Sequence, residues 1–172
     1  MRDTETAQIG IQAALTGHLV LTTLHTNSAA DAVVRLTDMG IEPFLIAASL
    51  RSVIGQRLVR RLCERCKTPD VAQADVVRGV CRKYGLAEPH EHGFHTSVGC
   101  PACGHTGFRG RMGVFEVLRL DSQIRALIGR KADSSSIVAA GRETGLTTML
   151  EDGLVKAAAG LTAVDEILRT VG

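Results

Sequence analysis

His18-Leu-Val-Leu-Thr-Thr-Leu-His25 is the stretch that decides the fold class, because it is a compact run of apolar and β-branched residues. Such a run predicts a strand buried on both faces of a parallel sheet. A helical pattern precedes the run, begins after Asp3 and Thr4, which are both good helix-capping types, and ends at Gly17. A second helical pattern follows between Ser28 and Gly40. Helix, buried strand and helix in succession predict an α/β domain.

Polar side chains follow at the carboxyl end of this predicted strand, in His25, Thr26 and Asn27. Open α/β sheets bind their ligands at that edge, so these three residues are candidates for a ligand site. The placement leaves a second interpretation open, because a histidine at a strand end more often has a structural role than a catalytic one.

The rest of the chain predicts an inserted subdomain and a mainly helical end. Composition changes at the first cysteine and again after the last one. We therefore expect three segments, which are residues 1–62, an insertion over residues 63–103, and a strand with helices over residues 104–172. The remaining expected elements are helices over residues 43 to about 53, 75–84, 122–128, 134–142 and 149–168, and strands over 56–59 and 111–120.

Two C-x-x-C pairs carry the strongest chemical signal, and they are formed by Cys63, Cys66, Cys100 and Cys103. Each pair on a tight turn presents two sulfurs to one tetrahedral ion. The long loop between the pairs is workable, because loop-closure entropy grows only logarithmically with length. Four thiolates leave no open coordination position, so the pairs predict a structural zinc site that folds the subdomain. Free thiols or a redox pair are the alternatives.

Four other residues between the outermost cysteines are open to more than one interpretation. His90, His92 and His95 precede the second pair, and they either compete as metal ligands or belong to an exposed polar loop. Cys81, the fifth cysteine, is expected to be a buried apolar thiol.

The composition predicts a folded, soluble protein, since 45% of the residues are hydrophobic and 22% are charged. A net charge of +2 is too small to predict nucleic-acid binding, and aromatic residues that stack on bases are scarce. No signal-peptide pattern and no run of about 18 apolar residues occurs, and paired cysteines suit a reducing compartment. We therefore expect a cytoplasmic protein. Arg57 and Arg60 belong to a basic run that we expect to be a solvated face.

The sequence lacks the pattern G-x-x-x-x-G-K-[ST] and a convincing nucleophile triad. A chain without that loop has no usual means of holding the β- and γ-phosphates of a nucleotide. We therefore expect these 172 residues not to hydrolyse a nucleotide by themselves.

Several stretches taken together identify a family. They are Met1-Arg2-Asp3-Thr4-Glu5-Thr6-Ala7, residues 16–27, 38–44, 56–60, 106–111 and 113–116, and both cysteine pairs. These stretches closely resemble the conserved centre of the type II secretion and type IV pilus-assembly ATPases. Nearly the whole chain is covered by this resemblance.

The resemblance implies a truncated RecA-like P-loop NTPase domain, of which this chain holds the C-terminal part, with a tetracysteine zinc-binding insertion and a helical C-terminal tail. His25 and His18 are then the His box near the γ-phosphate. The expected nucleotide-binding residues are Arg2, Asp3, Thr26 and Asn27, of which the first two end the Walker B segment. The resemblance also implies ATP and Mg in a longer parent chain, self-association as a hexamer, and platform proteins of the inner membrane as partners. The location is then cytoplasmic and peripheral to that membrane.

Two functions compete at this point. The first is a motor ATPase, whose activity resides in the parent chain and not in this piece. The second is a free-standing, zinc-stabilised adaptor module that docks on a secretion ATPase or its membrane platform. A zinc ribbon that binds nucleic acid is a third function, against which the small net charge and the scarcity of aromatic residues both count, so we expect no nucleic acid as partner.

Overall fold

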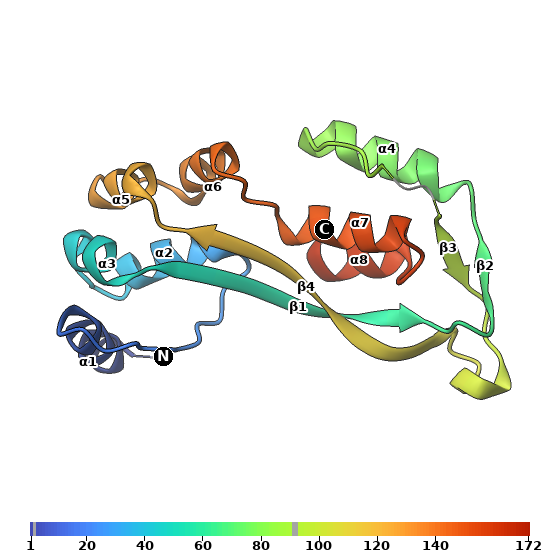
Figure 1. The fold of residues 1–172 in the computed structure, drawn as a ribbon, viewed down its shortest axis with the longest axis horizontal. Coiled ribbons are helices and arrows are strands. Elements are labelled where there is room, and N and C mark those ends of the chain that lie inside the picture. Colours follow the sequence, from blue (N-terminus) through green and yellow to red (C-terminus); the bar gives the residue numbers. More distant parts are fainter. Residues whose placement is uncertain (2, 91–92) are drawn as a thin grey trace. The chain divides into compact units, whose positions relative to one another are not determined.

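The structure is a computed structural model that describes residues 1, 3–90 and 93–172 (Figure 1). Its elements in chain order are α1 (Thr4–Leu15), α2 (Ala29–Asp38), α3 (Pro43–Ser49), β1 (Ser52–Leu62), β2 (Lys67–Pro69), α4 (Gln73–Tyr84), β3 (His95–Ser97), the short 3-10 helix η1 (Pro101–Cys103), β4 (Phe108–Arg119), α5 (Ser122–Gly129), α6 (Ser134–Glu143), α7 (Met149–Ala158) and α8 (Val164–Val171). They form two compact units. The first comprises residues 1–55 and 116–147, and the second comprises residues 56–115 and 148–172.

Four helices of the first unit begin where the sequence offers a capping side chain, whereas α3 has no side-chain cap. Asp3 accepts a hydrogen bond of 2.8 Å from the backbone N–H of Thr6 and so starts α1. Ser28 starts α2 in the same way, and Asp121 and Asp133 start α5 and α6. These caps satisfy N–H groups that have no partner within the helix. The predicted starts of α1 and α2 are thereby confirmed.

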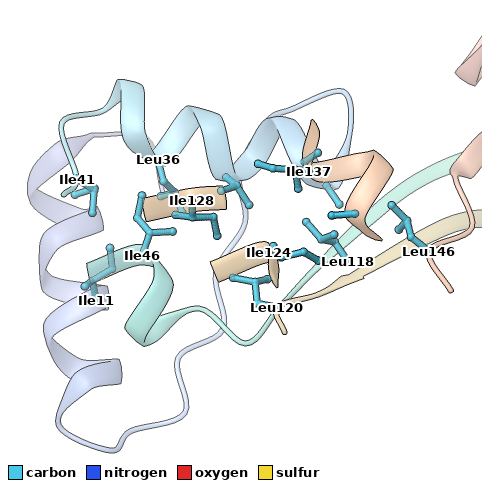
Figure 2. Packing of buried hydrophobic residues seen from close by; sticks show 14 of the residues in the cluster. Ile11, Leu36, Ile41, Ile46, Leu118, Leu120, Ile124, Ile128, Ile137 and Leu146 are labelled. Carbon is cyan, nitrogen blue, oxygen red and sulfur yellow. The ribbon is translucent and has the colours of Figure 1, made fainter. Parts of the chain in front are cut away.

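The core of the first unit is apolar and is drawn from five helices and the end of β4 (Figure 2). Ile46 of α3, Leu118 of β4 and Ile124 of α5 are completely buried. Burying each such side chain stabilises the fold by about 1.5 to 3 kcal/mol. Helix α3 contacts α1, α2 and α5, and α6 contacts α2 and α5, so α3 lies centrally among these helices.

The predicted buried strand over residues 18–25 is wrong for this structure. The segment is not in a strand, and the side chains of Leu19 and Leu21 are 88% and 86% exposed. A buried parallel strand needs neighbouring strands on its edges and covered faces on both sides. Among the described residues, the strands pair only as β1 with β4 and as β2 with β3, so none pairs with this segment. The amino group of Met1 donates to the carbonyl of Thr23 at 2.7 Å, but this hydrogen bond does not replace the ladder of backbone hydrogen bonds that a strand requires.

The second unit packs α4, α7 and α8 around parts of β1 and β4. Val59 of β1, Val114 of β4 and Ile167 of α8 are completely buried, and α7 and α8 lie side by side. Cys81 of α4 is 2% exposed within this core, and its thiol donates to the carbonyl of Ala87 at 3.6 Å. The prediction of a buried apolar thiol is therefore confirmed.

Several element boundaries differ from the prediction, and the strand expected over residues 111–120 spans Phe108–Arg119. The helix from Pro43 ends at Ser49, and the strand that follows spans Ser52–Leu62 instead of four residues. The single helix expected over residues 149–168 is two helices, because Gly160 between them adopts a left-handed conformation with φ +68°. Each of the two units combines two separate stretches of chain. The division into three consecutive segments remains a prediction.

No helix in the described ranges is both long and apolar enough to cross a membrane.

Candidate functional site

The two cysteine pairs meet because a short antiparallel ladder joins the chain just after the first pair to the chain just before the second pair. β2 follows directly after Cys66, and β3 ends shortly before Cys100. In this ladder Lys67 is opposite Ser97. The backbone N–H of Cys63 also donates to the carbonyl of Gly107 at 2.9 Å, which ties the first pair to the turn after the second.

The four sulfurs form a compact cluster. All of them lie within 4.8 Å of one another. The sulfur of Cys103 is 3.9 Å from that of Cys66 and 3.8 Å from that of Cys100. A tetrahedral zinc ion with Zn–S bonds of about 2.3 Å separates its sulfurs by about 3.8 Å. The four cysteines therefore fit one tetrahedral metal ion and can hold it.

The turn after the second pair also stabilises negative charge on sulfur. The backbone N–H groups of Cys100 and Gly107 each donate to the sulfur of Cys103 at 3.2 Å. Together these hydrogen bonds lower the pKa of the Cys103 thiol to about 6, and the bond from Cys100 has the larger effect. Burial acts in the opposite direction at Cys66, where it raises the pKa of the thiol to about 11. Cys103 is thus the thiol that the protein itself prepares as a thiolate ligand.

Two glycines allow the second knuckle to close. Gly99 has φ +105°, and a Cβ there would lie 2.6 Å from the carbonyl oxygen of His105. Gly107 has φ +76°, and a Cβ there would lie 2.5 Å from the Cβ of Ser97. Both positions combine a left-handed backbone with a close approach of another chain segment, which favours glycine on both counts.

His90 and His95, the two alternative histidine ligands that the structure describes, are not part of the cluster. Among the described residues, the group that can hold a metal contains the four cysteines and neither His90 nor His95. His95 instead has its Nδ1 2.6 Å from the carbonyl oxygen of Gly93. His92 lies outside the described residues.

The residues expected at the nucleotide site lie in the first unit. The imidazole of His18 is exposed at the end of α1, with its Nδ1 3.2 Å from Thr16 Oγ1 and 3.3 Å from the carbonyl oxygen of Ala13. The side chain of His25 is also exposed, in the segment that leads to α2. Both histidines remain predictions for a nucleotide site.

The remaining predicted nucleotide ligands are held by local contacts. Thr26 donates from Oγ1 to the carbonyl of Ser28 at 3.0 Å, and Asn27 beside it is exposed. The carboxylate of Asp3 caps α1. Arg2 lies outside the described residues. The structure therefore gives Asp3 a helix-capping role, and its role toward a nucleotide stays a prediction.

Two buried carboxylates were missed by the sequence reasoning, and the first is Glu116. It is 6% exposed on β4, and its Oε1 accepts a hydrogen bond from the backbone N–H of Ala29. The alternation of strand β4 contains the signal, because Val114, Glu116 and Leu118 occupy the same inward face. A charged residue at an inward position of a strand is informative, since it requires a partner.

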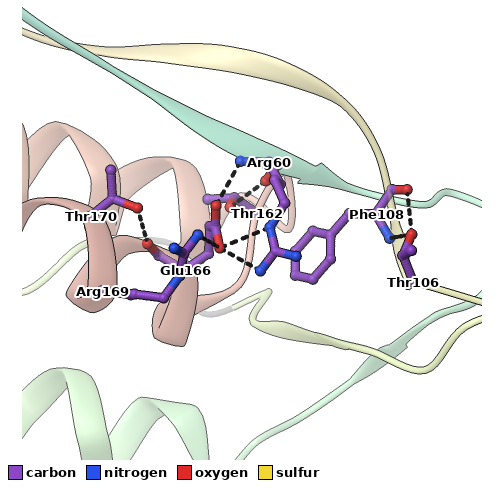
Figure 3. A network of polar contacts seen from close by, with 7 residues as sticks. All are labelled: Arg60, Thr106, Phe108, Thr162, Glu166, Arg169 and Thr170. Carbon is purple, nitrogen blue, oxygen red and sulfur yellow. Dashed lines mark hydrogen bonds and ion pairs between the residues drawn. The ribbon is translucent and has the colours of Figure 1, made fainter.

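The second missed carboxylate is Glu166 of α8, which is 3% exposed (Figure 3). Burial alone would raise its pKa, but hydrogen bonds from Arg60 and Arg169 outweigh burial and lower the pKa to about 2. Arg60 thus forms an ion pair with Glu166, and its side chain is still 45% exposed, in agreement with the expected solvated face. The sequence signal was the position of Glu166 between the buried Val164 and Ile167.

A family model described as "Type II/IV secretion system protein" matches residues 1–169. The chain is 45% identical over 174 residues to the type IV pilus assembly ATPase PilB of Thermus thermophilus, covering 99% of this chain and 19% of that protein. It is 46% identical over 169 residues to the type II secretion system protein HxcR of Pseudomonas aeruginosa, covering 98% of this chain and 32% of that protein. The chain thus spans about a third or less of the length of these relatives.

Two solved structures share the fold. The pilus retraction motor PilT with bound ADP superposes with a TM-score of 0.62 at 22% identity, over 98% of this chain and 37% of that one. The Legionella pneumophila ATPase DotB gives a TM-score of 0.60 at 21% identity, over 98% of this chain and 36% of that one. At such identities the likeness is one of fold alone.

Proposed function

Since the chain belongs to the type II/IV secretion system protein family, we propose that it is the C-terminal part of a RecA-like ATPase that powers type II secretion or type IV pilus assembly. The proposal is supported by identities of 45% and 46% to relatives named as a pilus assembly ATPase and a type II secretion protein. ATP and Mg then bind in a longer chain, which supplies the P-loop that these residues lack.

In that motor, His25 is the residue that meets the γ-phosphate. An imidazole N–H donates a hydrogen bond to a phosphate oxygen and loses that bond when the phosphate leaves. The exposure of His25 among the described residues supports this role, because an exposed ring is accessible to a ligand. His18, Asp3, Thr26 and Asn27 form the remainder of the proposed site, together with Arg2.

The four cysteines hold a structural zinc ion in this proposal. Four thiolates complete a tetrahedral shell, so the ion supplies folding free energy to the knuckles and leaves no position for a substrate. The support is the compact sulfur cluster, together with the backbone N–H groups that stabilise a thiolate at Cys103.

Assembly and location follow from the same premise. We propose a hexamer that contacts the platform proteins of the secretion or pilus machine at the cytoplasmic side of the inner membrane. A ring of subunits that share nucleotide sites converts ATP hydrolysis into the movement of rigid domains. The names of the relatives support the part of this proposal that concerns a secretion or pilus machine.

The test compares ATP hydrolysis by the 172-residue chain with hydrolysis by the full-length natural chain that carries it, both with bound metal measured. We expect turnover only in the full-length chain. There, His25→Ala lowers kcat at least about tenfold with little change in KM, since one transition-state hydrogen bond is lost. His90→Ala, at another exposed histidine, is the matched control and leaves both constants unchanged.

Two results would overturn parts of this function. Hydrolysis of ATP by the 172 residues alone would show that they contain a complete catalytic site, which contradicts the proposal. A full-length chain that binds zinc but never hydrolyses ATP would favour the adaptor module instead.

A further inference from the structure

Glu116 is one of the few charged residues that the described part of the chain buries. It is 6% exposed, and it occupies the inward face of β4 between Val114 and Leu118, which are both completely buried. A carboxylate in such surroundings is unfavourable unless hydrogen-bond donors meet it. The donors that meet Glu116 therefore indicate why the charge is there.

One of these donors lies in the first turn of α2. The backbone N–H of Ala29, the first residue of the helix and itself 1% exposed, donates to Glu116 Oε1. N–H groups of a first turn have no partner inside the helix, and the helix dipole makes this end attractive to negative charge. Ser28 Oγ accepts from Asp31 N at 3.0 Å. Two acceptors thus hold the start of α2, namely the hydroxyl of the adjoining Ser28 and the carboxylate of Glu116 from the distant strand β4.

A glycine on β1 makes room for this contact. A Cβ at Gly55 would lie 2.7 Å from Cγ and 3.1 Å from Oε1 of Glu116. The φ angle of Gly55 is not in the left-handed region, so the backbone itself does not require glycine there. The side chain of Glu116 is the reason for the small residue.

The start of α2 is joined to the His25 segment by a short, tied turn. The hydroxyl of Thr26 donates to the carbonyl of Ser28 at 3.0 Å, and Ala29 follows at once. A displacement of the first turn of α2 therefore displaces the residues that lead into it. Because the carboxylate of Glu116 already occupies this helix start, an incoming phosphate is met by the side chains before α2 and not by its first N–H group.

We propose that Glu116 is a positioning residue for the nucleotide site, which fixes the first turn of α2 and thereby the orientation of His25, Thr26 and Asn27. It touches no substrate. The inference rests on the proposed function for the assignment of His25 to that site, but the structural link between Glu116 and the segment stands independently of it.

The experiment follows the backbone of residues 25–29 by NMR in the 172-residue chain and nucleotide turnover in the full-length natural chain. In Glu116→Ala, we expect the amide of Ala29 to exchange about fivefold to tenfold faster, the factor for one lost capping hydrogen bond, and the amide signals of residues 25–28 to shift. Glu116→Gln retains an acceptor of the same shape and restores most of this protection. Gly55→Ala, whose new Cβ crowds the side chain of Glu116, reproduces the effect of Glu116→Ala while the carboxylate itself is retained.

Glu166→Gln is the matched control, because Glu166 is the other deeply buried glutamate and belongs to the second unit. It leaves the signals of residues 25–29 unchanged. In the full-length chain, Glu116→Ala lowers kcat about tenfold at an unchanged KM for ATP, and Glu116→Gln recovers most of the loss.

Unchanged exchange at Ala29 in Glu116→Ala, or equal acceleration at every amide of the first unit, would overturn the positioning role. If exchange at Ala29 accelerates as expected but His25→Ala leaves turnover intact, the link holds and the nucleotide role of His25 fails. If His25→Ala abolishes turnover while Glu116→Ala leaves kcat unchanged, the positioning proposal fails alone.

Discussion

Arg60 Nη2 lies 2.7 Å from Oε2 of Glu166, and the Nε and the backbone N–H of the same arginine donate to that carboxylate at 3.0 and 3.1 Å. The guanidinium also covers the ring of Phe108, with 4.0 Å between Cζ and the ring centroid (Figure 3). Thr162 donates to the carbonyl of Arg60 at 2.8 Å. One residue of β1 thus holds both the start of α8 and the turn before it.

Replacement of Arg60 by methionine is expected to destabilise the protein by about 2 kcal/mol. Removing one partner of a buried pair costs about 3 to 5 kcal/mol because it leaves a charge uncompensated. We expect a loss smaller than this range because the side chain of Arg60 is 45% exposed and Arg169 remains bound to the carboxylate. Denaturant unfolding at neutral pH measures the change. Arg61→Met, at the exposed neighbouring arginine, is the control and stays within about 0.5 kcal/mol of the wild type.

The ion pair also predicts a dependence of stability on pH. The pKa of Glu166 is lowered in the folded protein to about 2 from an ordinary value of 4.5. A carboxyl group of this kind stabilises the fold fully above its unfolded pKa, and this contribution is lost as the pH falls from about 4.5 toward 2. The free-energy difference between the wild type and Glu166→Gln should therefore shrink on acidification from about pH 6 to about pH 3. A difference that stays constant over this range would show that the carboxylate is not preferentially ionised in the fold.

Local signals were sufficient to predict much of the helical structure. Asp3 and Ser28 lie next to the helices that they cap, so the sequence around them contains both partners of each capping bond. The cysteine pairs are equally local, because each is formed within four residues. Only the meeting of the two pairs depends on a distant contact, the ladder between β2 and β3.

Partners far apart in the sequence account for what was missed. Glu116 meets Ala29 across 87 positions, and Glu166 meets Arg60 across 106. No pattern in a single sequence states which donor a buried carboxylate will find. The segment over residues 18–25 was predicted wrongly for a related reason. Its composition fits a buried strand, but a strand forms only where another strand hydrogen-bonds to it.

The knuckle after the second cysteine pair allows a paired test of two glycines in the same turn. Gly104 and Gly107 both have positive φ, at +60° and +76°, but a Cβ at Gly104 meets nothing within 4 Å. Alanine at either position adds the left-handed strain of about 1 to 2 kcal/mol. At Gly107 the new Cβ also approaches Ser97, so Gly107→Ala should lower both stability and metal affinity further than Gly104→Ala. Equal effects on metal affinity, measured by competition with a chelator, would contradict the close approach.

Metal removal is expected to disorder residues 63–107 and to spare the first unit. Replacement of Cys103 by serine removes the ligand that two backbone N–H groups prepare as a thiolate, so we expect the chain to lose most of its zinc. Cys81→Ser is the matched control, because Cys81 is buried away from the sulfur cluster and its replacement leaves the zinc content unchanged.

Amide hydrogen exchange distinguishes a structural metal from an incidental one. The core of the first unit, with Ile46, Leu118 and Ile124, includes none of the four ligands. In Cys103→Ser or after chelation, protection should therefore fall in residues 63–107 and persist at those three residues. Protection that is the same with and without zinc in residues 63–107 would mean that the ion does not fold the knuckles. Loss of protection throughout both units would mean that the metal supports the whole chain and not its own subdomain.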